Sequence, residues 1–159
     1  MPKHCDRIMT EGLSDNLRIA GAKLLAALDD AGLQAHGAAW IFDHTLGDWR
    51  FVVATSLVET MGRTRVYREL LTVMKKLDMP EEMTINDVHL ESTESVLFKA
   101  LSRVVRVESG AVAVFRDCAI NGTKFDAHIY RWSHAPPTRA EAQNVERQFK
   151  RRIKELVRT

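Results

Sequence analysis

The chain has 159 residues, of which 45% are hydrophobic and 28% are charged. These fractions are typical of folded globular proteins and exclude a disordered or fibrous chain. The length suits one domain with a substantial core, so we expect a single α+β domain over residues 1–159 with a flexible leader over residues 1–12.

The cysteines and the apolar runs indicate a cellular location. The chain has two cysteines, Cys5 and Cys118, and they form no CxxC pair, which suits a reducing compartment. The first residues lack the apolar core of a signal peptide, and no run reaches the roughly 18 apolar residues that a membrane span needs. We therefore expect a cytoplasmic protein.

The first half of the chain predicts a helix and then a hairpin. Ser14 precedes leucines and alanines at helical spacing, and Gly32 follows them, so a helix is expected between these two residues. Residues 38–46 and 49–57 are β-branched and aromatic runs around Gly47, which predicts a hairpin. Either register gathers six side chains on one face, the candidate core face: Trp40, Phe42, His44, Trp49, Phe51 and Val53.

The middle of the chain predicts two further helices. Residues 63–77 place apolar side chains on one stripe, and residues 83–90 suit a short strand. Ser92 opens a third helix with a wide apolar face that should be well buried and that ends before Gly110. This face comprises Val96, Leu97, Phe98, Leu101, Val104 and Val105.

The last third predicts a second hairpin and a final helix. Residues 111–120 and 123–132 flank Asn121-Gly122, the strongest short hairpin signal in the chain. Thr138 and Glu141 then form a capping box that opens a helix. The sequence thus predicts two α-β-β-α halves that share one antiparallel sheet of two hairpins, with four helices. This order is shared by several unrelated α+β folds and indicates no function.

An aromatic cluster and an arginine pair are the candidate ligand-binding groups. His44 is expected beside Trp40, where burial would favour the neutral imidazole and let it act as a base or a stacking group. Arg63 and Arg65 follow Gly62 at a helix start, where backbone N–H and guanidinium groups hold phosphate or carboxylate. The alternative interpretations are that His44 has a structural role and that Arg63 and Arg65 belong to a solvated helix face. The P-loop and dinucleotide-binding glycine patterns are absent from the chain.

Acidic residues of the second hairpin form another candidate group. If Asn121-Gly122 is a two-residue turn, Asp117 faces Asp126, with Lys124 and His128 diagonal to them. Such a group could bind a cation or transfer protons, but solvated charges are commoner at a hairpin tip.

Metal and nucleophile patterns are weak throughout the chain. Asp87, His89 and Glu91 would share one face of a short strand, which is more typical of a polar edge than of a metal site. The six histidines are scattered without an HExxH motif, and Cys118 reads as a small buried residue. We therefore assign no catalytic residue, no metal and no cofactor.

The final helix, over residues 138–157, combines a narrow apolar stripe with positive charge. Net charge is only +2, but residues 139–159 carry seven Arg or Lys against three Glu. The stripe could pack against the chain itself or against a second subunit, so its members are candidate interface residues. They are Val145, Phe149, Ile153 and Leu156.

Three functional hypotheses follow. The first is a non-enzymatic binding module, a homodimer or a partner-protein binder, that acts through its sheet face or the final helix. The second is a nucleic-acid-associated protein that uses the region of residues 63–68 and the final helix as a split basic surface. The third is a small-ligand-binding protein or enzyme with a pocket between sheet and helices that holds an anion. No membrane partner is expected.

Overall fold

The computed structural model describes residues 13–44, 47–105, 107, 112–120, 123–133 and 135–158. The predicted leader 1–12 and the turn residues Asn121 and Gly122 lie outside these residues. In chain order the elements are α1 (Asp15–Asp30), β1 (Gly37–Asp43), β2 (Asp48–Ala54), α2 (Leu57–Met61), α3 (Arg63–Lys75), the 3-10 turn η1 (Ile85–Asp87), β3 (Val88–Glu91), α4 (Val96–Val104), β4 (Ala113–Ile120), β5 (Thr123–Trp132) and α5 (Arg139–Arg158).

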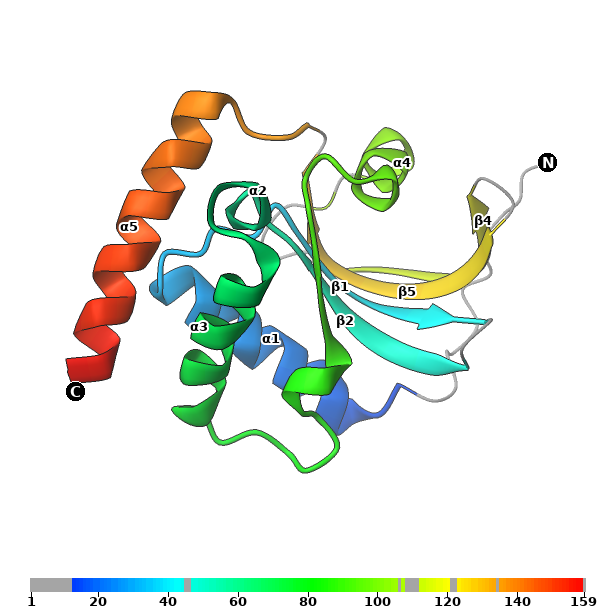
Figure 1. The fold of residues 1–159 in the computed structure, drawn as a ribbon. Coiled ribbons are helices and arrows are strands. Elements are labelled where there is room, and N and C mark those ends of the chain that lie inside the picture. The colour runs from blue at the N-terminus through cyan, green and yellow to red at the C-terminus, as the bar shows by residue number, and fades with distance from the viewer. Residues whose placement is uncertain are drawn as a thin grey trace.

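Both predicted hairpins are present, and they meet in one sheet of strand order β3-β2-β1-β5-β4 (Figure 1). Strand β1 pairs antiparallel with β2 on one side and with β5 on the other. The short strand β3 pairs with β2 in parallel. The sheet is therefore mixed and five-stranded, and the prediction of a purely antiparallel sheet of two hairpins is wrong in this respect. The loop through η1 brings β3 to the edge of the sheet in the same direction as β2.

Helices cover the two faces of the sheet unequally. Helices α1, α3 and α5 pack on the face that carries Trp40, Phe51 and Val53, as the period-two pattern predicts. Helix α4 packs on the opposite face, where Phe98 and Leu101 contact the alternate residues of β1, β2 and β5. Figure 1 shows α4 on one side of the curved sheet and α1 and α3 on the other. The strands of the middle of the sheet are therefore apolar on both faces.

The local signals of the sequence explain where the first elements begin and end. The Ser14 hydroxyl accepts a hydrogen bond from the Leu17 N–H and caps α1. Gly47 has a φ of +70°, the left-handed conformation that glycine adopts without strain, and it lies in the turn that joins β1 to β2. The register pairs Trp40 with Phe51 and Phe42 with Trp49, which confirms the predicted aromatic face.

A close approach of α1 to the sheet depends on a glycine. A Cβ atom on Gly21 would lie 2.5 Å from the indole nitrogen of Trp40 and 2.9 Å from the hydroxyl of Tyr130. The two side chains donate hydrogen bonds to the carbonyls of Leu17 and Arg18, respectively. Gly21 therefore lets two polar groups of the sheet reach the backbone of α1.

Several predicted boundaries are wrong, and the strand expected over residues 83–90 begins only at Val88, after the 3-10 turn. The second strand ends at Ala54 instead of Leu57, because the buried Thr55 hydroxyl accepts the Leu57 N–H at 3.2 Å and the chain turns into α2. The described residues thus form five helices instead of the predicted four. Helix α4 begins after Ser95, whose hydroxyl caps it, and not after Ser92.

The apolar face of α4 is narrower than predicted. Phe98 and Leu101 are buried, but Val96 and Val104 are 76% and 67% exposed. The two halves also differ in arrangement, because α1 and α3 share one face whereas α4 and α5 lie on opposite faces. The similarity of the halves is confined to the order of their elements.

Helix α5 packs against its own chain. Thr138 and Glu141 exchange the two hydrogen bonds of the predicted capping box, at 2.8 and 3.2 Å. Three residues of the predicted interface stripe, Val145, Phe149 and Ile153, are buried in the core with α1 and α3, and Leu156 is partly buried there. The stripe is therefore covered by its own chain. None of the helices that the structure describes has the length and apolarity to cross a bilayer.

Candidate functional site

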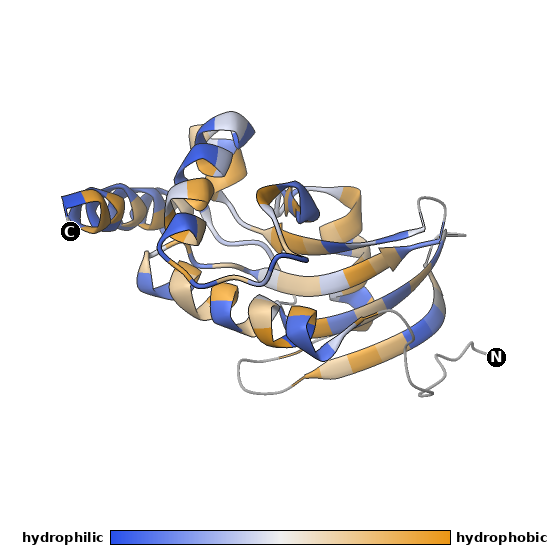
Figure 2. Cartoon of the chain, turned by 90° about the horizontal axis from the view of Figure 1, so that it is seen from below, coloured by the Kyte–Doolittle hydropathy of each residue, from blue (hydrophilic) through white to orange (hydrophobic). Residues whose placement is uncertain are grey.

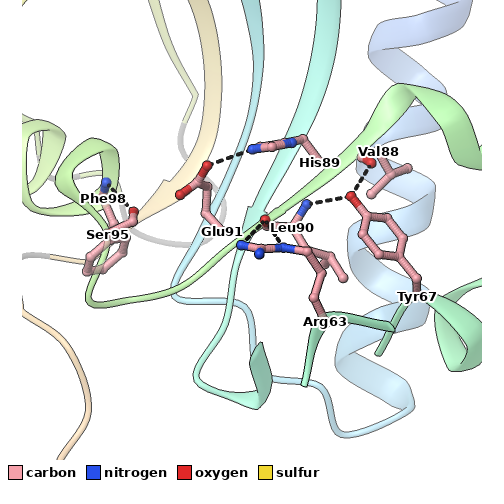
Figure 3. Close-up of polar contacts among 8 residues, drawn as sticks. All are labelled: Arg63, Tyr67, Val88, His89, Leu90, Glu91, Ser95 and Phe98. Carbon is pink, nitrogen blue, oxygen red and sulfur yellow. Dashed lines mark hydrogen bonds and ion pairs between the residues drawn. The ribbon is translucent and has the colours of Figure 1, made fainter. Parts of the chain in front are cut away.

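Side chains of α3 cover the outer edge of β3. The Tyr67 hydroxyl donates to the Val88 carbonyl at 2.8 Å and accepts from the Leu90 N–H at 3.0 Å. The Arg63 guanidinium donates to the Leu90 carbonyl through Nε and Nη2, at 3.3 and 3.2 Å (Figure 3). An open strand edge attracts other chains, and these contacts satisfy its polar groups instead.

A histidine–carboxylate pair lies on the α4 side of the same strand. His89 Nε2 is 2.6 Å from an oxygen of Glu91 (Figure 3). Burial raises the pKa of Glu91, but hydrogen bonds from His89 and Ser95 and the charges of His89 and Arg63 outweigh it, so the pKa lies below its ordinary value. Glu91 is therefore ionised at neutral pH. Its carboxylate accepts a hydrogen bond from the Nε2–H of His89 and fixes the orientation of the imidazole.

A pocket of about 490 Å³ opens next to this edge, between β2, η1, β3 and α3. We call it the Arg50 pocket. Three of its side chains carry or can carry positive charge, and none of its lining residues is acidic. The lining comprises Arg50, Thr64, Tyr67, Arg68, Leu71, Ile85, Asn86, Val88 and His89.

The Arg50 side chain is the unusual group of this pocket. Arg50 lies on β2 opposite Ile41, on the α4 side of the sheet. Its Nε is buried and has no hydrogen-bond partner among the residues that the structure describes. A buried donor without a partner costs about 1–3 kcal/mol, and more when it is charged. Most buried polar groups of native proteins do have a partner, so Arg50 requires an explanation.

Two of the four predicted ligand-binding residues lie at the first hairpin. Trp40 is 1% exposed, and its indole N–H donates to the Leu17 carbonyl at 3.0 Å, so it is engaged in the core. His44 follows the end of β1, and its side chain is 40% exposed, at 3.4 Å from Asp126. Its ring contacts Phe42 at 5.3 Å between centroids, but the expected burial of His44 among the aromatic side chains is wrong.

The two predicted arginines enter different contacts. Arg63 covers the edge of β3, whereas Arg65 lines a smaller groove of about 160 Å³ between α3 and α5. These contacts do not gather the arginines with Trp40 and His44. Two other arginines, Arg50 and Arg68, line the larger Arg50 pocket.

The pair of carboxylates predicted in the second hairpin, Asp117 and Asp126, does not form. A β-bulge gives Asp117 a φ of +55°, and its backbone N–H donates to the buried carboxylate of Asp126 at 2.6 Å. The Asp117 side chain is exposed, so the two carboxylates do not form a pair. Lys124 pairs with Ala119 in the register and is exposed. Within the described residues, no three His, Cys, Asp or Glu side chains are placed to hold a metal ion.

No family model matches this chain, and no curated protein or solved structure is significantly similar to it. Chemical inference therefore depends on the residues themselves. Two guanidinium groups, the Thr64 hydroxyl and the Asn86 side-chain amide line one pocket and are donors that suit phosphate or carboxylate. The pocket volume falls within the range typical of small-molecule sites.

Arg50 was not among the predicted site residues, because an arginine across a hairpin from Asp43 is typical of a solvated ion pair. The register instead pairs Asp43 with Asp48, and Arg50 with Ile41. One signal was available. An arginine between Trp49 and Phe51, in a strand that turns out to be covered on both faces, is a charge placed where apolar residues are usual.

Proposed function

We propose that this chain is a non-enzymatic binding module that holds a small anionic ligand in the Arg50 pocket. The observation that carries the proposal is the buried Nε of Arg50, a charged donor without a described partner, in a pocket with no acidic lining residue. An oxyanion would accept a charge-assisted hydrogen bond from this group, and such bonds are worth about 1.5–3 kcal/mol.

The lining also indicates what else the ligand carries. The pocket is also lined by the ring of Tyr67 and by the aliphatic side chains of Leu71, Ile85 and Val88. A free phosphate ion would fill only a small part of about 490 Å³. We therefore expect an organic anion, with a phosphate or carboxylate against Arg50 and Arg68 and an apolar part against the aliphatic residues.

Calorimetric titration tests the proposal with two probes, inorganic phosphate and phenyl phosphate, at an ionic strength fixed with chloride. We expect both to bind and phenyl phosphate to bind more tightly, because its ring removes apolar surface from water. Arg50→Met and Arg68→Met should each weaken binding by about tenfold or more, since each removes a charged donor worth about 1.5–3 kcal/mol.

Arg103→Met is the matched control, because Arg103 is an exposed arginine on α4 that does not line the pocket. It should leave both affinities unchanged. Arg68 is exposed and its replacement leaves the core intact, so this variant tests the site even if Arg50→Met is poorly folded. Equal affinities for wild type, Arg68→Met and Arg103→Met would refute the anion site.

The homodimer and the cytoplasmic location stay predictions. Val145, Phe149 and Ile153 are buried in their own chain and both sheet faces carry helices, so a dimer would use another surface. Among the described residues β4 pairs with β5 alone and exposes Val114, so we propose the outer edge of β4 as the surface for such a contact. A solution mass that stays monomeric at high protein concentration would exclude the dimer.

A further inference from the structure

The exposed face of α5 carries a straight row of positive charges. Arg147, Arg151, Lys154 and Arg158 are spaced by four, three and four residues, which places them on one side of the helix. The row extends for about 16 Å along the axis at 1.5 Å per residue. All four side chains are exposed, opposite the buried stripe. Figure 2 shows hydrophilic residues along the whole of α5, with hydrophobic ones at helical intervals.

Helix α3 adds charge beside this row. The groove of about 160 Å³ between α3 and α5 is lined by Arg65, Lys150 and Lys154, together with Glu69 and three apolar residues. Of the region of residues 63–68 in the predicted split basic surface, Arg65 lies beside α5, whereas Arg63 covers the edge of β3 and Arg68 lines the Arg50 pocket. We call the set of Arg65, Arg147, Lys150, Arg151, Lys154 and Arg158 the basic ridge.

Most of the ridge is not neutralised by the chain. Lys150 pairs with Glu146 at 2.6 Å, and Arg147 contacts only the neutral amide of Asn144. Within the part of the chain that the structure describes, the other four ridge residues have no ion pair. Elsewhere the chain does pair its charges, as in the two-pronged contact of Arg131 with Asp29 at 2.8 and 2.9 Å. The ridge therefore keeps a surplus of exposed, unpaired cations.

The surroundings of the ridge select among anionic partners. A helix that lies in a membrane surface inserts its apolar face, but the apolar face of α5 is buried against α1 and α3. Protein interfaces have an aromatic or aliphatic centre, whereas Val157 is the one large apolar residue exposed on α5. Proteins that bind single strands stack bases on aromatic rings, and no aromatic side chain is among the exposed large hydrophobic residues of the described chain.

We propose that the basic ridge binds the phosphate backbone of double-stranded nucleic acid without sequence preference. Arginine and lysine side chains in a row neutralise successive phosphates and release condensed counterions, which supplies the affinity. The proposal assigns no base readout to the ridge, because contacts to phosphates carry no sequence information. This site is separate from the Arg50 pocket and does not depend on the ligand proposed there.

Fluorescence anisotropy with a labelled DNA duplex tests the ridge over a series of salt concentrations. We expect binding that weakens steeply with salt and that is equal for two unrelated sequences of the same length. The plot of log K against log salt has a negative slope, to which each phosphate contact contributes about 0.9 in magnitude. The double variant Arg151→Gln/Lys154→Gln should therefore make this slope shallower by about two. Both side chains are exposed, so the fold should persist.

The matched control is Lys99→Gln/Arg103→Gln, which removes the same charge from α4 on the opposite face of the sheet. It should bind the duplex like the wild type, and so should Arg50→Met, which tests the other site. The proposal is overturned if the duplex does not bind or binds independently of salt. It is also overturned if the salt dependence of binding falls as much in the α4 control as in the ridge variant. Tighter binding to the single strand, or equal binding to phosphatidylserine vesicles, also overturns it.

Discussion

The replacement Phe149→Ala tests how α5 is attached to the rest of the molecule. Phe149 is 0% exposed and packs with residues of α1 and α3 in the larger core cluster. Truncation of a buried phenylalanine costs about 3–5 kcal/mol, from lost burial and from the cavity that remains. The groove between α3 and α5 already reaches Phe149, so the surroundings can relax and we expect about 3 kcal/mol.

Urea unfolding followed by circular dichroism measures this loss. Val157→Ala is the control, because Val157 lies on the same helix and is 62% exposed, so its replacement should change the free energy of unfolding by no more than about 0.5 kcal/mol. The two variants together separate packing of α5 from its helix propensity.

Protein concentration distinguishes packing within one chain from packing between two. If α5 docks on its own chain, the midpoint of unfolding is independent of concentration and the loss in Phe149→Ala is the same at every concentration. If the stripe docks on a second subunit, stability rises with concentration. A loss below about 1 kcal/mol, or a midpoint that depends on concentration, would refute the docking described for Phe149.

Three further predictions concern the sheet face and the Arg50 pocket. Gly21→Ala should destabilise the chain by about 1–3 kcal/mol, because the new methyl group meets the Trp40 indole at 2.5 Å, and a thermal melt equal to that of the wild type would contradict this close approach. Burial and then the charge of Arg18 lower the pKa of His128 below 6.5, so the unfolded chain binds more protons than the folded chain just below pH 6.5. The free energy of unfolding should therefore fall as the pH drops from 6.5 towards the folded-state pKa, and it should fall less in His128→Gln. Urea unfolding that gives the same pH dependence for both proteins between pH 7.5 and 5.5 would count against this effect of His128. Arg50→Met should leave the ligand-free protein as stable as the wild type or more stable, because it removes a buried donor without a described partner, whereas a loss above about 2 kcal/mol would mean that Arg50 is structural.

Local signals were sufficient to predict four of the five helices and both hairpins. The Ser14 cap, the Gly47 turn and the Thr138–Glu141 capping box each depend on residues a few positions apart, and all three are present as predicted. The aromatic face of the first hairpin could also be predicted, because the side-chain period of a strand is two and both registers agreed.

Long-range pairing could not be predicted in the same way. Nothing local indicates that β3 joins β2 in parallel, since that pairing is set by the loop through η1 and by how α3 packs. Helix α4 lies on the opposite face because β1, β2 and β5 carry a second set of apolar side chains there. A strict alternation of apolar and polar residues would instead make this face the solvent side. For that reason the predicted anion site was placed at Arg63 and Arg65, and Arg50 was not among its residues.

The Nε–H signal of Arg50 in a nitrogen–proton correlation spectrum tests the central claim most directly, because it reports on a buried, charged donor that has no described partner. The signal, assigned by its loss in Arg50→Met, should shift in a saturable way on titration with phenyl phosphate, while the signal of Arg103 stays in place. An Arg50 signal that is unmoved by the ligand, or that moves only as much as that of Arg103, would contradict an anion site at this residue.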